Sequence, residues 1–177
     1  MKVVVAIDPS INFCGYAIYV NNIKWVLYSK GLIKPDKSIT DEVEKASNIY
    51  EKCKKLIDDI SLIDGYRIGE CSIVLVVENP AHWKVGGYVA RESGNIQKLI
   101  LLVGKLSTLI NNTVLVHPHE WKGQCPKPVT RARMVRRLER FGADKLANYV
   151  SICNHNVLDA IGIGYWYIFL KDKKKMV

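Results

Sequence analysis

Two short apolar runs, each ending in an acid, constrain the fold of this chain more than any other feature. Residues 2–8 read KVVVAID and residues 72–78 read SIVLVVE, so the runs end in Asp8 and Glu78. Both runs place β-branched residues at successive positions without polar alternation, which predicts strands buried on both faces. A carboxylate beside such a strand is costly unless it is paired, hydrogen-bonded or bound to a metal. We therefore expect both acids to be paired, hydrogen-bonded or bound to a metal.

Turn signals and apolar periodicity predict the other elements of the chain. Strands at 14–20 and 23–33, joined by an Asn-Asn turn, would form an antiparallel meander with the first strand. A short strand is expected at 113–118, followed by an irregular basic loop at 119–128. Apolar residues at three- and four-residue steps predict helices at 41–63, 92–110, 129–141 and 154–170. We expect one α/β domain with a mixed sheet over residues 1–170, followed by a basic tail at 171–177.

Composition excludes some classes of protein. The chain is 49% hydrophobic, which supports a sizeable core. No stretch approaches the roughly 18 apolar residues of a membrane span, so no membrane association is expected. The five cysteines are scattered and include no C-x-x-C pair. They predict reduced thiols in the cytoplasm and argue against both a disulfide framework and a zinc site.

The positive charge of the chain is concentrated in one region. The net charge is +9, from 26 Lys and Arg against 17 Asp and Glu. A basic total alone is as consistent with solubility as with binding, but residues 122–140 carry seven basic residues and one acid. This distribution favours a polyanionic partner. The lysines of 171–175 predict a solvated end with weak affinity for phosphate.

A third acid completes a candidate metal site. Asp159 lies on an otherwise apolar helix, and His155 and Asn156 share its face at four- and three-residue spacing. If the two acidic strands are neighbours, their carboxylates repel each other at one sheet edge, and Mg²⁺ or Mn²⁺ resolves that conflict. Each acid alone has an ordinary interpretation: Asp8 as a turn cap, Glu78 as an exposed strand end, Asp159 as part of a solvated helix face.

The ordered motifs resemble those of RuvC-type Holliday junction resolvases. The matching stretches are AIDPSINFCGYAIY, VLVVENP and NHNVLDAIGIGYW, and HPHEWKGQCPKPVTRARMV resembles the basic loop and helix of phage-type relatives. The resemblance spans nearly the whole chain. It implies the RNase H-like fold: a mixed five-stranded sheet of three antiparallel strands followed by parallel strands, flanked by helices. A phage-encoded protein acting in the host cytoplasm would fit it.

The resemblance also implies an activity: a metal-dependent endonuclease that resolves Holliday junctions or other branched DNA by paired, symmetric cleavage. Asp8, Glu78 and Asp159 would bind two Mg²⁺ or Mn²⁺ ions. Relatives usually carry Asp or His three positions before the last acid, where this chain has Asn156. Either that residue or His155 would therefore complete the site, as a ligand, a general base or a residue that positions water.

The resemblance further suggests how DNA is held. Trp83 or Tyr88, on a Gly-bearing loop, would wedge between bases. For Trp83 an equally good interpretation is that the side chain is buried and anchors the loop to the core. The remaining candidate DNA contacts are basic: Lys84 and Arg91 on the same loop, Lys122 and Lys127 near the scissile phosphate, and Arg131 and Arg133 on the duplex arms. A two-fold homodimer would use helix 92–110, because symmetric cuts need two active sites.

Three alternatives share part of this pattern. Another RNase H-like nuclease, acting on flaps or RNA–DNA hybrids, would use the same acids without needing a dimer. A catalytically impaired junction-binding module would keep the basic region with a defective metal site. An ATPase of the related actin-like fold also begins with an acidic hairpin, but the sequence has no Gly-rich phosphate loops of that kind.

Overall fold

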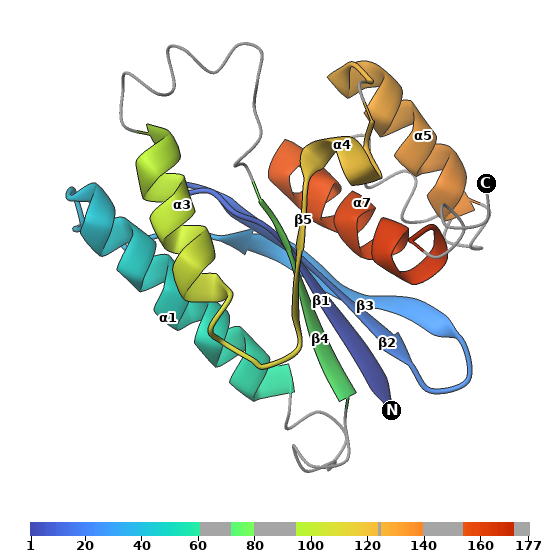
Figure 1. The fold of residues 1–177 in the computed structure, drawn as a ribbon, viewed down its shortest axis with the longest axis horizontal. Helices are drawn as coiled ribbons and strands as arrows, with labels where there is room; N and C mark the ends of the chain where they lie inside the picture. The colour runs from blue at the N-terminus through green and yellow to red at the C-terminus, as the bar shows by residue number, and fades with distance from the viewer. Residues whose placement is uncertain (61–71, 80–94, 124, 140–153, 172–177) are drawn as a thin grey trace.

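A computed structural model describes residues 1–60, 72–79, 95–123, 125–139 and 154–171 (Figure 1). The elements in chain order are β1 (Lys2–Asp8), β2 (Cys14–Asn21), β3 (Trp25–Ile33), α1 (Glu42–Ile60), β4 (Ser72–Glu78), α3 (Asn95–Leu106), β5 (Thr113–Val116), α4 (Pro118–Trp121), α5 (Lys127–Glu139) and α7 (His155–Phe169). No helix in these ranges is long and apolar enough to cross a membrane.

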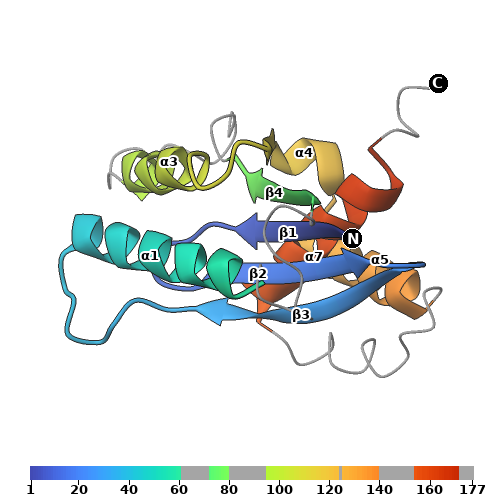
Figure 2. The ribbon, with the colours of Figure 1, turned by 90° about the horizontal axis from the view of Figure 1, so that it is seen from below.

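The sheet has the strand order β3-β2-β1-β4-β5. β1 pairs antiparallel with β2, and β2 pairs antiparallel with β3. β4 runs parallel to both β1 and β5. The mixed five-stranded sheet predicted from the sequence is therefore confirmed. Figure 2 shows β4, β1, β2 and β3 side by side.

Helices cover both faces of this sheet. α1 and α3 lie on one face, and α4, α5 and α7 lie on the other (Figure 1). Side chains alternate along β1, so Val3, Val5 and Ile7 pack toward α1 and α3, whereas Val4 and Ala6 pack toward α7. The first strand is thus buried on both faces, as its uninterrupted apolar sequence predicts.

α7 lies close against the sheet because of a small residue in its middle. A Cβ added to Gly164 would come closer than 3.0 Å to the Tyr19 ring of β2. The Tyr19 hydroxyl donates a hydrogen bond to the Ile161 carbonyl at 2.8 Å and so joins the helix to the strand. The glycine and the hydroxyl together hold α7 close to β2.

Several predicted boundaries were wrong. β5 ends at Val116, two residues before the expected end, and Pro118 belongs to α4. α3 ends at Leu106, four residues before the expected end, because Thr108 and Leu109 donate backbone bonds to residues three positions earlier. The expected irregular loop at 119–128 contains α4 and the first residues of α5. α4 is too short for a periodic signal, and it begins at Pro118, a residue suited to the first helical turn.

Candidate active site

Side-chain alternation places the first two acids on the same face of the sheet. Asp8 follows Val4 and Ala6 on the α7 side of β1, and Glu78 follows Val76 on the α7 side of β4. β1 and β4 are parallel, with Ala6 opposite Val76. Two residues later, both strands end at one sheet edge with a carboxylate on the α7 side.

α7 brings the third acid to this edge. Gly15 of β2 pairs with Asp8, and a Cβ added to Gly15 would clash with the backbone carbonyl of Asn156. The missing side chain lets the first turn of α7 rest directly on the strand. Asp159 lies one turn further along, so the helix delivers its carboxylate to the two acids of the sheet.

Burial and neighbouring charges alter the pKa values of Asp8 and Glu78. Burial raises the pKa of Asp8 well above its usual range, the negative charges of Glu78 and Asp159 raise it further, and Lys122 opposes the shift. Burial also raises the pKa of Glu78, while Lys122 and a hydrogen bond from Trp121 lower it. Burial is therefore the first cause of both raised pKa values, and the neighbouring carboxylates add to it.

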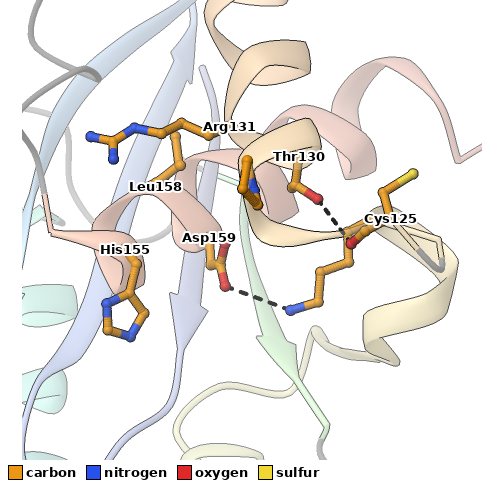
Figure 3. Close-up of a pocket in the computed structure, with 8 residues that line it drawn as sticks. Cys125, Thr130, Arg131, His155, Leu158 and Asp159 are labelled. Atoms are coloured by element: carbon orange, nitrogen blue, oxygen red, sulfur yellow. Dashed lines mark hydrogen bonds and ion pairs between the residues drawn. The ribbon is translucent and has the colours of Figure 1, made fainter.

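Lys122 lies between two of the acids. Its Nζ is 3.5 Å from Glu78 Oε2 and 3.5 Å from Asp159 Oδ2. The second of these ion pairs is drawn in Figure 3. Lys122 is the residue that follows α4, so the missed short helix is what places its ammonium group. The sequence predicted Lys122 near the scissile phosphate but did not predict its ion pairs with Glu78 and Asp159.

The donor chemistry of the site fits a hard divalent cation. Carboxylate oxygens are the ligands that Mg²⁺ and Mn²⁺ prefer, and a cation would offset both the burial and the carboxylate repulsion that raise the pKa of Asp8. Within the described residues, no three His, Cys, Asp or Glu side chains are already arranged as a ligand set. Two of the three acids, Glu78 and Asp159, instead form ion pairs with Lys122.

The two candidates for the fourth position differ in their surroundings. Asn156 is buried, and its side-chain amide donates to the Phe13 carbonyl, tying α7 to the chain between β1 and β2. Its backbone N–H is capped by the Asn154 side chain at 2.9 Å. His155 is exposed, and Figure 3 shows that its ring does not point toward the Asp159 carboxylate.

A cavity of about 410 Å³ opens beside Asp159 (Figure 3). Its lining combines cationic, polar and apolar side chains: Lys122, Cys125, Pro128, Thr130, Arg131, His155, Leu158 and Asp159. Of the four basic residues predicted in this region, Lys122 and Arg131 line the cavity. Arg133 instead donates to the Cys125 sulfur, and Lys127 is the first residue of α5.

The loop predicted to contact DNA after β4 cannot be compared with the structure. Trp83, Lys84, Tyr88 and Arg91 all lie outside the described residues.

Sequence reasoning missed Trp121. The residue is buried, and its indole Nε1 donates to Glu78 Oε2 at 2.6 Å. The available signal was an apolar aromatic residue inside a stretch expected to be a polar, irregular loop. A side chain of that size needs a hydrophobic environment, which a solvated loop does not supply.

The fold has counterparts among solved structures. Thermus thermophilus RuvC, in complex with a Holliday junction substrate, superposes with a TM-score of 0.59 at 13% identity, over 98% of this chain and 97% of that one. A second Thermus thermophilus RuvC structure gives 0.60 at 12% identity, over 97% and 96%. The yeast mitochondrial Holliday junction resolvase Ydc2 gives 0.58 at 12% identity, over 98% and 83%.

At the level of sequence, no family model and no curated protein matches this chain. Structural likeness at 12–13% identity establishes the architecture, and activity is a separate question. The strand order, the helices on both faces and the nearly complete mutual coverage with these structures give the chain the RuvC-like RNase H fold.

Proposed function

We propose that this chain is a metal-dependent endonuclease that resolves Holliday junctions or other branched DNA by paired symmetric cuts. The observation that carries the proposal is the convergence of Asp8, Glu78 and Asp159, from three distant segments, around Lys122. Crowded carboxylates beside a basic region are suited to phosphodiester hydrolysis. The likeness in fold to a RuvC solved with a Holliday junction substrate gives further support.

The three acids would hold Mg²⁺ or Mn²⁺, two ions per site, with His155 or Asn156 completing the set. When bound, such ions supply an activated water and stabilise the departing oxygen. The basic side chains of the protein would act on the substrate. Lys122 lies between two of the acids and would offset the charge of the scissile phosphate, and Arg131, in the cavity wall, would hold the adjoining backbone.

A homodimer would supply the two active sites that paired cuts require. α3 offers a surface for it, because Ile100 and Leu101 are 47% and 40% exposed. This exposed apolar stretch, on the sheet face opposite the acids, would let two copies pair while both catalytic edges stay accessible.

The test is cleavage by the purified protein of a four-way junction, a flap, an RNA–DNA hybrid and a linear duplex, with Mg²⁺ or Mn²⁺. Asp8→Asn removes one carboxylate of the site. Asp59→Asn is the matched control, because Asp59 is an exposed acid near the end of α1. We expect symmetric nicks in the junction with wild type and Asp59→Asn, and none with Asp8→Asn.

Other outcomes assign other functions. Cleavage of flaps or hybrids in preference to junctions would identify a different RNase H-like nuclease. Tight junction binding without cleavage in either metal would identify a binding module. Equal cleavage by Asp8→Asn and wild type would contradict the assignment of the site itself.

A further inference from the structure

We propose that Trp121 is a positioning residue for the metal site, holding Glu78 through its indole N–H while its ring holds the helix that carries Asp159. This inference rests on the function proposed above, in which Glu78 and Asp159 are ligands of one metal site. It adds a residue outside the acidic set, from an element that the sequence did not predict.

The first contact is a hydrogen bond to a buried carboxylate. Trp121 Nε1 lies 2.6 Å from Glu78 Oε2, and the two residues are 5% and 6% exposed. A hydrogen bond to a buried carboxyl oxygen meets little competing water and is directional. Lys122 approaches the same oxygen, so within the described residues Oε1 is the oxygen left for a cation.

The second contact ties the indole ring to α7. A Cβ added to Gly162 would come closer than 3.0 Å to the Trp121 ring carbon Cζ3, so the ring lies flush against the helix backbone. Gly162 lies three residues after Asp159, on the same side of α7. One rigid side chain thus spans the strand end that carries Glu78 and the helix that carries Asp159.

α4 is itself anchored, which gives Trp121 a defined position. The His117 backbone N–H donates to Glu120 Oε2 at 2.6 Å, closing a capping box at the start of the helix. The His117 ring lies 3.3 Å from the Asn79 carbonyl, directly after the end of β4. The short helix is therefore attached to the strand whose acid it orients.

A second tryptophan offers a matched control. Trp166 is buried in the same hydrophobic cluster as Trp121, and its Nε1 has no hydrogen-bond partner among the described residues. Replacing either residue with Phe removes an indole N–H from the same hydrophobic cluster. Only Trp121→Phe takes that donor away from a carboxylate, so a purely structural role predicts similar effects for both variants.

The experiment is calorimetric titration of the DNA-free protein with Mn²⁺ alone. Residues that orient metal ligands typically contribute about 10- to 100-fold to metal affinity, so we expect Trp121→Phe to bind about tenfold more weakly. Trp166→Phe should bind as wild type does. Junction affinity without metal should be the same for all three proteins, because no DNA contact is removed.

A measurement on wild type covers the case in which Trp121→Phe does not fold. The four tryptophans give up to four indole N–H resonances. We expect one of them to move on addition of Mg²⁺, and the same one to be displaced in Glu78→Gln.

The failures are distinguishable. Equal Mn²⁺ affinity in Trp121→Phe and wild type, or an indole resonance displaced in Glu78→Gln that Mg²⁺ leaves unmoved, overturns the role of Trp121 alone. Absence of Mn²⁺ binding to wild type overturns the metal site and the proposed function with it.

Discussion

Gly15 lies so near Asn156 that a Cβ on the glycine would fall closer than 3.0 Å to the backbone carbonyl oxygen of Asn156. Gly15 is also the β2 partner of Asp8, and Asn156 stands three residues before Asp159. The contact between these two backbones therefore sets how closely the acid of the helix approaches the acid of the strand.

We expect Gly15→Ala to push the first turn of α7 away from the sheet. Overpacking of this kind costs about 1–3 kcal/mol of stability. Displacing a catalytic group by about 1 Å can cost about 100-fold in rate, so cleavage should fall far more than thermal stability alone explains. Thermal unfolding and junction cleavage, measured on the same preparation, check both effects.

Gly104→Ala is the control for this substitution. A Cβ there meets nothing within 4 Å and the site lies inside α3, so alanine should stabilise the fold by about 0.5–1 kcal/mol. Wild-type cleavage by Gly15→Ala would show that the approach of α7 does not govern the site.

Asp8→Asn should raise the melting temperature of the metal-free protein while abolishing cleavage. The folded-state pKa of Asp8 is raised, so the native state binds that proton more tightly than the unfolded chain does. The ionised carboxylate then costs stability as pH rises through the folded pKa. A gain of about 1 kcal/mol corresponds to about 2–4 °C in a chain of this size.

Calorimetry at neutral pH and again at about pH 4 measures this gain, which should shrink at the lower pH because the wild-type carboxyl is then protonated. Added Mg²⁺ should stabilise wild type and leave Asp8→Asn unchanged. A variant less stable than wild type without metal would contradict the cost assigned to burying the Asp8 carboxylate beside two other acids.

Lys122→Met should make the metal-free protein less stable. Lys122 lowers the pKa of Glu78, and its removal lets that pKa rise further. Because a carboxyl with a raised folded pKa loses stability as pH increases, the deficit should be larger at about pH 8 than at about pH 5. Thermal unfolding at both values measures it, with Lys52→Met, which breaks an exposed ion pair with Asp36, as the control.

A pH-independent deficit in Lys122→Met would mean that the variant acts through lost packing of the lysine stem. The ammonium group would then have no measurable part in holding the acids.

The proposed dimer can be broken on α3. Ile100→Asp with Leu101→Asp places two charges on its exposed apolar stretch, and desolvating them at an interface is costly. We expect light scattering to report a dimer for wild type and a monomer for the double variant. Ile23→Asp is the control, since Ile23 is 97% exposed in the turn between β2 and β3. A wild-type monomer at all concentrations would remove this part of the proposal.

The sequence predicted the strands, and the position of an acid at the end of two of them, because these features depend on local pattern. An uninterrupted β-branched run predicts a strand that is buried on both faces. The ends of β1 at Asp8 and of β4 at Glu78 could therefore be predicted from the sequence alone. Alternation and parallel pairing then dictate that the two acids share a face. Asp159 stood out because its helix is otherwise apolar.

The parts that sequence reasoning missed depend on contacts between distant segments. α4 is held by a capping box and by its link to Asn79, neither of which has a periodic signature. The placement of Trp121 and Lys122 follows from that helix. The role of Gly15 could be seen only once α7 was in place, because a glycine in a strand has several possible reasons.

The acids come from β1, β4 and α7, and α7 packs on β1 and β2. During synthesis on the ribosome, β1 and β4 emerge more than 70 residues before the helix that carries Asp159. A nascent chain therefore holds two of the acids but no complete site until its final described helix has left the exit tunnel and docked. Order of synthesis thus delays assembly of the candidate site until the tertiary structure is complete.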